Sequence, residues 1–392
     1  MTIAPVTLDS LTRPTDAAAP AHAGLGPLRR LPVPAHVQAS YTTRFVAERL
    51  ARQPERFHLL AGADVVPQAG TVVIARVTEI LQHKRIETPE SRKAILFQGA
   101  VVMLAYGHRY AADQFLAEVP NALGPCHLVA AGGLAGWVTA QHAGIDEPTR
   151  IEPLGILADE NGPVHLADAA PCVLTAVPAV GATQAELDAV LPHRPPVIAV
   201  LGTSMNSGKS TAMACLINGL TAAGLRVNAG KATGTGAGND PMLYVDAGAR
   251  EVRDFTDFGH PTTFRLDLAS VRALTVSLID VLSADRPDVV VVEIADGVYQ
   301  GETAALLADP LFQASVDGVL FSATDALGAV AGVSVLESAG MPVLGVSGVL
   351  TSSPLATLEA REVLSVPVEA TFDLTYSDVA VSLMPGMRVA AG

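Results

Sequence analysis

One segment of this chain combines the residue types and the spacing that bind phosphate groups. Residues 202–210 read Gly-Thr-Ser-Met-Asn-Ser-Gly-Lys-Ser, which fits the pattern G-x-x-x-x-G-K-[ST]. The glycines let the backbone curl so that several N–H groups point at phosphate oxygens, and a helix after the loop adds the positive end of its dipole. Lys209 would bridge the β- and γ-phosphates of a nucleotide, and the Ser210 hydroxyl would ligate Mg²⁺. We expect Lys209 to be exposed at the loop.

The predicted nucleotide-binding residues belong to the loop and to the first turn of the helix that follows. They are Gly202, Thr203, Ser204, Asn206, Ser207, Gly208, Lys209, Ser210 and Thr211. The context supports this interpretation, because an apolar stretch precedes the loop and a helical pattern ending near Gly224 follows it. The predicted cofactors are ATP and Mg²⁺.

A site of this kind also needs an acidic residue at the end of a buried strand. Residues 288–293 read Asp-Val-Val-Val-Val-Glu, which places Glu293 at the carboxyl end, where open α/β sheets bind their ligands. A carboxylate there can hold the metal or its water, and it is otherwise an expensive group to bury. Three aspartates downstream of the loop 231–240 could complete the metal shell, namely Asp246, Asp254 and Asp257. We favour Asp246, so the predicted metal site is Ser210, Asp246 and Glu293.

Two further clusters have open interpretations. Residues 231–240 place Lys231 and three glycines after a predicted strand, and such a loop either brings the backbone close to an anion or is a flexible surface loop. Residues 106–110, Tyr-Gly-His-Arg-Tyr, with Asp113 and Gln114 nearby, form the densest polar and aromatic group of the first half. This group is either a substrate or partner surface or an ordinary turn at a strand end.

The elements that must position these residues follow two different patterns. In the second half, near-continuous Val and Ile runs alternate with helical patterns, which indicates a parallel sheet covered on both faces. The predicted strands are 197–201, 226–229, 289–294, 318–322 and 343–347. Helical faces between them include 213–220 and 271–282. The predicted fold class is α/β, with a C-terminal P-loop NTPase domain over residues 191–392 and a smaller, mostly β N-terminal domain before it.

The first half favours strands. Residues 1–40 are rich in Ala, Pro and Thr and are predicted to be a disordered tail, and 41–190 form the mostly β domain with its linker. Strands are predicted at 71–77, 93–97 and 101–106, and a hairpin at 149–166 turns at Asp-Glu-Asn-Gly. Helices are predicted within 40–60 and, over a small and Gly-rich stretch, within 128–142. A small barrel is compatible with this pattern, and the Pro-containing sequence around 178 and 192–196 is predicted to be a linker.

Composition narrows the class of partner. The formal net charge is −14 and no dense Lys/Arg stretch occurs, which argues against nucleic acid. No apolar run approaches the roughly 20 residues of a membrane helix, and we see no signal peptide. Three widely spaced cysteines lack CxxC pairing. We therefore expect a cytoplasmic protein without a nucleic-acid or membrane partner that acts on a small molecule, and a homodimer is compatible with the sequence.

The C-terminal half resembles the dethiobiotin synthetase group of phosphate-loop enzymes, which also includes cobyrinic acid amidating synthetases and MinD-like ATPases. The resemblance spans about 195–350, and it is carried by 202–210, 230–234, 292–297 and 323–328. It implies that Lys209 and Ser210 take the ATP phosphates and the metal. Lys231 would face the activated substrate group and Glu293 would be a metal ligand, so the implied catalytic residues are Lys209, Lys231 and Glu293.

Two positions depart from that group. Its members often carry an asparagine for the adenine base after the fifth strand, where this chain has Val346-Ser347-Gly348. MinD-like ATPases carry a lysine just after the first glycine of the loop, where this chain has Thr203. The same half also looks somewhat like a bacterial family in which a phosphate-loop domain accompanies acetylation of D-glutamate from acetyl coenzyme A. The N-terminal domain of that family looks Rossmann-like, unlike the β-rich half here.

Three functions follow as hypotheses. Members of the synthetase group phosphorylate a carboxylate or carbamate and then let a nucleophile displace the phosphate, so the first is a Mg-ATP-dependent ligase or kinase for a small carboxylate-bearing metabolite. The second is an N-acyltransferase that uses the loop to hold the phosphates of acetyl coenzyme A. The third is a nucleotide-switched binding protein or metallochaperone.

Overall fold

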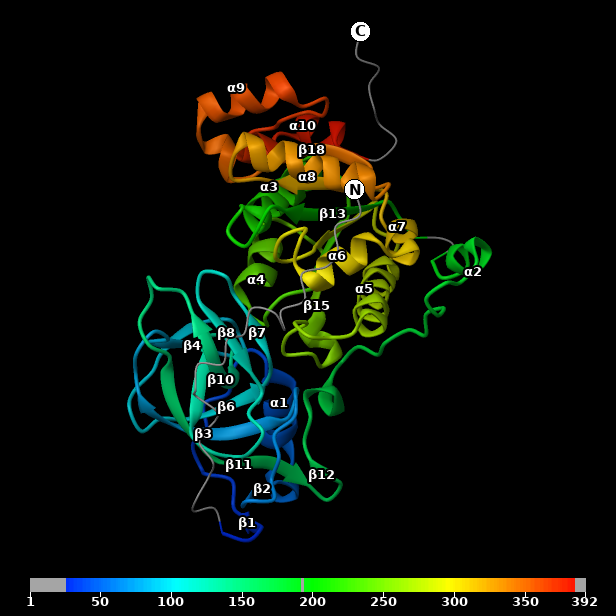
Figure 1. The fold of residues 1–392 in the computed structure, drawn as a ribbon. Coiled ribbons are helices and arrows are strands. Elements are labelled where there is room, and N and C mark those ends of the chain that lie inside the picture. Colours follow the sequence, from blue (N-terminus) through cyan, green and yellow to red (C-terminus); the bar gives the residue numbers. More distant parts are fainter. Residues whose placement is uncertain (1–25, 192–193, 385–392) are drawn as a thin grey trace.

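The computed structural model describes residues 26–191 and 194–384, which form two lobes stacked end to end (Figure 1). The N-terminal lobe is built almost wholly of strands. Its elements are β1 Arg29–Leu31, α1 Arg44–Arg52, β2 His58–Ala61, β3 Val72–Glu79, β4 Arg85–Glu87, β5 Lys93–Ile95, β6 Val101–Tyr106, β7 Arg109–Tyr110, β8 Phe115–Glu118, β9 Cys126–Ala130, β10 Leu134–Gln141, β11 Thr149–Asp159 and β12 Gly162–Pro163. The predicted mostly β domain is confirmed.

Five of these strands close into a barrel. β11 pairs with β3, β3 with β6, β6 with β10, β10 with β9, and β9 again with β11. Alternation along β3 assigns its two faces: Val73, Ala75 and Val77 lie in the interior cluster, whereas Val72 and Ile74 pack with Val46 of α1. The barrel therefore buries one face of β3 inside and covers the other with α1.

The helix predicted within 128–142 is wrong. This stretch forms the antiparallel strands β9 and β10, joined by a turn with Gly133 at φ +105°. Its glycines serve close packing, because a Cβ added at Gly133 would overlap the Ser40 side chain and one at Gly132 would overlap the backbone of Gly236. The small residues of this stretch thus allow other segments of the chain to pack closely against β9 and β10.

Two predicted loose segments are ordered where the structure describes them. Within the predicted tail, β1 pairs with β2, and Gln38 exchanges backbone hydrogen bonds with Val101 and Met103; residues 1–25 lie outside the described part. Within the predicted linker, the Thr175 N–H donates to Ser277 Oγ at 2.7 Å, and the short helix α2 (Gln184–Asp188) buries Leu187. This connection therefore lies along the C-terminal lobe; residues 192–193 are not described.

The C-terminal lobe alternates strands and helices as predicted. Its elements are β13 Val197–Gly202, α3 Lys209–Ala222, β14 Val227–Lys231, α4 Asn239–Asp246, β15 Val252–Asp254, α5 Leu268–Ser283, β16 Val289–Glu293, α6 Gly301–Leu307, α7 Pro310–Ser315, β17 Gly318–Ser322, α8 Ala326–Ser338, β18 Val343–Ser347, α9 Pro354–Val363 and α10 Ser377–Ser382. The strands run parallel in the order β15-β14-β16-β13-β17-β18.

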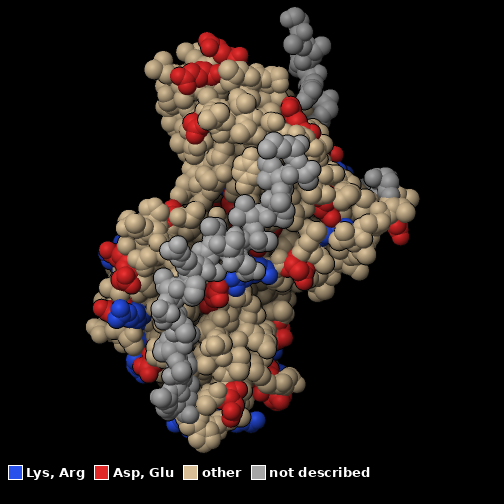
Figure 2. Space-filling view, in the orientation of Figure 1, with Lys and Arg blue, Asp and Glu red and all other residues tan. Residues whose placement is uncertain are grey.

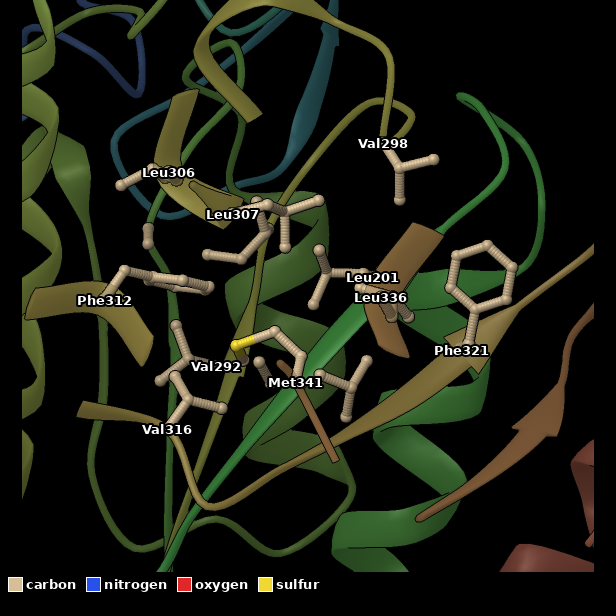
Figure 3. Packing of buried hydrophobic residues seen from close by; sticks show 14 of the residues in the cluster. Leu201, Val292, Val298, Leu306, Leu307, Phe312, Val316, Phe321, Leu336 and Met341 are labelled. Atoms are coloured by element: carbon tan, nitrogen blue, oxygen red, sulfur yellow. The ribbon is translucent and has the colours of Figure 1, made fainter. Parts of the chain in front are cut away.

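Helices cover both faces of this sheet, as parallel sheets require. On one face α3, α4 and α10 pack with Ile198, Val200 and their neighbours. On the other, α5 to α9 enclose a larger apolar cluster, in which Leu201 and Val292 of the sheet face Leu306, Leu307 and Phe312 (Figure 3). Because β13 and β14 both pair in parallel with β16, the carboxyl ends of these three strands meet at one edge of the sheet.

The surface is largely uncharged on the face in Figure 2. Lys and Arg side chains occur there mainly over the N-terminal lobe, where they lie among Asp and Glu. Among the helices of the described residues, none combines the length and the apolar character needed to cross a membrane.

Candidate functional site

The phosphate-binding loop lies between β13 and α3, as the motif predicts. Gly208 has φ +94° and precedes the first helical residue, and a Cβ placed there would lie 3.1 Å from Gly348 Cα. A Cβ at Gly202 would overlap Ser207 Oγ. Both glycines are therefore required by the path of the loop. The first N–H groups of α3 have no partner within the helix and are free to bind an anion.

Lys209 is buried, which corrects the expectation that it is exposed. The residue is 6% exposed, and Nζ donates to the carbonyl oxygens of Ser204 at 2.8 Å and Asp296 at 2.9 Å. The turn after β16 folds over the loop so closely that a Cβ on Gly297 would overlap the Thr203 backbone. Burial lowers the pKa of Lys209, while the charge of Glu293 opposes that change. The ammonium group is thus held at the loop by main-chain oxygens.

Glu293 stands beside the loop on the neighbouring strand. In the β13–β16 ladder Val200 pairs with Glu293, whose side chain is 2% exposed. Its Oε2 accepts from Ser210 Oγ at 3.0 Å and from the Tyr244 hydroxyl. Its Oε1 accepts from Lys231 Nζ at 3.0 Å. The structure therefore brings together the predicted residues Ser210, Lys231 and Glu293. The loop 202–210 thus joins a buried strand to a helix of a parallel α/β sheet, which is the context that a phosphate-binding loop requires.

Lys231 is paired with two carboxylates at this edge of the sheet. It forms ion pairs with Glu293 and with Asp240, the second residue of α4. Burial alone would lower the pKa of Lys231, but the two carboxylates outweigh it and raise that pKa. Burial likewise opposes ionisation of Asp240, yet Lys231 keeps the pKa of Asp240 below its ordinary value. Lys231 and Asp240 are therefore both charged near neutral pH.

Asp246, the favoured third metal ligand, does not reach this site. It is exposed at the end of α4 and is absent from the pocket wall, whereas Asp240 lines the pocket. Six helical residues turn the side chain by about 600°, so Asp240 and Asp246 point to different sides of α4. The other two candidates lie at the junction of the lobes, where Asp254 accepts from Tyr41 and Asp257 pairs with Arg44.

The donor set around Ser210 fits Mg²⁺. The Ser210 hydroxyl and the Glu293 carboxylate are hydrogen-bonded neighbours that would both offer oxygen ligands, and Asp240 adds a second carboxylate to the same wall. Among the described residues no group of three His, Cys, Asp or Glu side chains forms a closed metal cage. Mg²⁺ commonly takes one or two carboxylates plus substrate phosphates and water, so an open site of this kind suits it.

A pocket of about 690 Å³ extends from the phosphate-binding loop to the N-terminal lobe. Its C-terminal wall contains Lys209, Ser210, Lys231, Asp240, Glu293 and Asp296. Its N-terminal wall contains Gln82, His83, Glu87, Arg109, Tyr110, Asp113 and Gln114. The polar group noted at 106–110 with Asp113 and Gln114 therefore reaches the pocket through Arg109 and its neighbours, whereas Tyr106 is buried in the barrel.

The glycine-rich loop 231–240 joins the two lobes. The Gly238 N–H donates to Glu87 Oε2 at 2.7 Å, and a Cβ at Gly238 or Gly236 would overlap the side chains of Ser91 or Thr42. These glycines thus allow the barrel to dock closely, and residues 234–237 also line the pocket. A second link between the lobes lies in the pocket wall, where Asn206 of the loop donates to Asp113 Oδ2 at 2.8 Å.

Asp296 occupies an unusual position above Lys209. Its φ of +62° is left-handed, a conformation that non-glycine residues rarely adopt. Burial raises the pKa of Asp296 to about 6, although Lys209 and Lys231 act in the opposite direction. A carboxylate that changes charge near neutral pH therefore lies in the wall of the pocket.

Several residues of the site were missed from the sequence. Asp240 and Tyr244 carry no motif of their own, and only the start of α4 at Asn239 turns them toward Glu293. His83 and Glu87 belong to the barrel and reach the pocket through docking of the lobes. Their only advance signal is that His83 lies in the short basic stretch 83–85.

No protein-family model matches the chain, and no curated protein matches it. Similar solved structures include the signal recognition particle receptor FtsY from Elizabethkingia anophelis, at 17% identity and a TM-score of 0.34 over 51% of this chain and 70% of that one. A nucleotide-binding protein from Archaeoglobus fulgidus, solved with ADP, has 14% identity and a TM-score of 0.34 over 51% and 93%. Chloroplast FtsY from Physcomitrella patens has 18% identity and a TM-score of 0.29 over 56% and 71%. These likenesses are distant, span about half of this chain and assign it no activity.

Proposed function

We propose that this protein is a Mg-ATP-dependent enzyme that activates a small carboxylate-bearing metabolite by phosphoryl transfer, as enzymes of the dethiobiotin synthetase group do. The observation that carries the proposal is the pocket of about 690 Å³ between the lobes, which has the size of a small-molecule site. The phosphate-binding loop occupies only one wall of it. The remaining volume offers room for an acceptor beside the terminal phosphate.

The roles follow from the contacts. Lys209, held at the loop, would bind the β- and γ-phosphates, and Ser210 with Glu293 would hold Mg²⁺, which neutralises charge on the phosphates when bound. Lys231 Nζ donates to Glu293 Oε1 at 3.0 Å, and in this proposal it would attract the acceptor carboxylate. Phosphoryl transfer depends mainly on positioning and charge neutralisation, which two lysines and a metal provide.

The reaction balances without a further reagent. One oxygen of the acceptor carboxylate forms a bond to the γ-phosphorus. The bond from that phosphorus to the β,γ-bridging oxygen breaks, and ADP leaves with the electron pair. The product is an acyl phosphate, which a nucleophile can then attack at carbon.

The test combines ATP with small mono- and dicarboxylates and with hydroxylamine, which converts an acyl phosphate into a stable hydroxamate. We expect at least one carboxylate to stimulate ADP formation and to yield the hydroxamate. Lys231→Met should lose both signals. Lys84→Met is the matched control, because Lys84 is exposed and its ion pair with Asp146 lies on the surface. Carboxylate-independent hydrolysis without hydroxamate would contradict the proposal and favour a nucleotide-switched protein.

A further inference from the structure

Arg109 is a buried cation to which the described part of the chain supplies no ion-pair partner. The residue is 7% exposed and lies on β7, in the N-terminal wall of the pocket. Nη2 donates to Gln114 Oε1 at 3.0 Å, whereas Nε and Nη1 have no hydrogen-bond partner within residues 26–191 and 194–384. Arg44, also at the junction of the lobes, is by contrast paired with Asp257 at 2.9 Å.

A buried guanidinium without an ion-pair partner destabilises the folded protein unless a ligand binds it. Removing a charge from water costs several kcal/mol, which an unpaired guanidinium does not recover. Burial lowers the pKa of Arg109 only to about 10, against the opposing charges of Asp113 and Asp296, so it remains protonated at neutral pH. Neither aspartate lies within ion-pair distance of it among the described residues. The Nε–H and Nη1–H groups of Arg109 are therefore available to a ligand.

Arg109 is also the only cation that the N-terminal lobe presents to the pocket among its described lining residues. Burial and the charge of Arg109 itself lower the pKa of the neighbouring His83 to about 3, so that imidazole is neutral. Glu87 and Asp113 are acidic. An anion in this part of the pocket consequently has one place to bind.

We infer that Arg109 binds an oxyanion of the reacting complex, either the carboxylate of the acceptor or the terminal phosphoryl group of the nucleotide. The inference rests on the proposed function of the same pocket. A guanidinium fork suits both groups, because each presents two oxygens to parallel N–H donors. The β7–β8 turn is fixed to the phosphate-binding loop by the Asp113–Asn206 hydrogen bond of 2.8 Å, so Arg109 is held in register with the phosphates.

The alternative is that Arg109 only supports the fold, balanced at longer range by Asp113. The two roles predict opposite stability effects. Arg109→Met keeps most of the volume and removes the unpaired charge, so under our inference the apo protein melts at the same or a higher temperature. A purely structural arginine would lower the melting temperature when it is replaced.

The experiment is calorimetric titration of wild type, Arg109→Met and Arg109→Lys, with Arg76→Met as an exposed control from the same lobe. The ligands are Mg-ADP, the non-hydrolysable Mg-AMPPNP, and, on Mg-ADP-loaded protein, inorganic phosphate and glutarate. We expect all variants to bind Mg-ADP within about twofold of wild type. Arg109→Met should lose about tenfold or more in affinity for an oxyanion, and Arg109→Lys should recover only part of it.

The choice of ligands distinguishes the two oxyanions that Arg109 could bind. Weaker binding of Mg-AMPPNP and phosphate assigns Arg109 to the phosphoryl group, and weaker binding of glutarate assigns it to the acceptor carboxylate. Unchanged affinities for all oxyanions, absence of oxyanion binding by Mg-ADP-loaded wild type, or a lower apo melting temperature with equal loss of every ligand would overturn the inference. Failure of wild type to bind any nucleotide is a different result, which overturns the proposed function.

Discussion

The hydroxyl oxygen of Ser210 lies 3.0 Å from Oε2 of Glu293, although the two residues are 83 positions apart in the chain. They meet because β13 and β16 are parallel neighbours, so the loop after one strand and the end of the other share an edge of the sheet. Lys231, on the next strand, binds the second oxygen of the same carboxylate. Glu293 thus connects the group expected to hold Mg²⁺ with the group expected to face the acceptor.

Replacing Glu293 by glutamine should affect turnover more than nucleotide affinity. The amide keeps a similar shape but removes the charge that would hold the metal, so we expect Mg²⁺-dependent ADP formation to fall about 100-fold. The affinity for Mg-ATP should fall less than about tenfold, because the loop and Lys209 remain. Glu337→Gln, on the exposed side of α8, is the control. Unchanged turnover in Glu293→Gln would transfer the metal role to Asp240.

Replacing Lys231 by methionine should destabilise the protein in a pH-dependent way. Glu293 and Asp240 would lose their shared cation, which should lower the free energy of unfolding by about 3–5 kcal/mol near neutral pH. In wild type the pKa of Asp240 is lowered, so its stabilising contribution is present above the unfolded pKa and is lost as the pH falls through the folded pKa.

The deficit of Lys231→Met should therefore shrink as the pH falls. Protonation of Asp240 removes its charge, and the repulsion between the two carboxyl groups then disappears. Urea unfolding near pH 7.5 and near pH 4.5 measures this difference, with Lys84→Met as the control. A deficit of equal size at both pH values would show that the effect comes from lost packing.

Replacing Asp296 by asparagine should stabilise the protein at alkaline pH. The folded pKa of about 6 lies above the ordinary value of 3.8, so the fold favours the protonated carboxyl. Its contribution is fully present below the unfolded pKa and is lost as the pH rises through about 6. Asp296→Asn should therefore gain melting temperature relative to wild type between about pH 4 and pH 8. A difference that does not change over this range would contradict the assignment.

Features encoded by contiguous residues could be predicted from the sequence. The loop and its flanking strand and helix carry a local motif, and the strands at 318–322 and 343–347 have the predicted bounds, because buried parallel strands are short, continuous apolar runs. β15 was missed, since its three residues at the sheet edge give no such run. The helix predicted within 128–142 was wrong because the small residues there allow close contacts with distant segments and do not reflect a local helix propensity.

Only those residues of the candidate site that belong to a sequence motif or to the end of a predicted strand could be predicted. Ser210, Lys231 and Glu293 come together because strand ends converge. Asp240, and not the predicted Asp246, lies at the site, because the residue at which α4 begins determines which of its side chains face the sheet. Burial of Lys209 depends on the turn at Asp296, and the exposure of Arg109 to the pocket depends on docking of two lobes. These are tertiary relationships that no local pattern encodes.

The most direct test of the account is a thermal-shift series with Mg-ATP, Mg-GTP and acetyl coenzyme A on wild type and Lys209→Ala. A ligand at about 100 times its Kd stabilises the native state by about 2.7 kcal/mol, which is readily detected. We predict that Mg-ATP stabilises wild type, and that Lys209→Ala keeps its fold and loses this stabilisation. Stabilisation by acetyl coenzyme A alone would contradict the account and identify an acyltransferase, and an equal response of Lys209→Ala to Mg-ATP would show that the loop is not the nucleotide site.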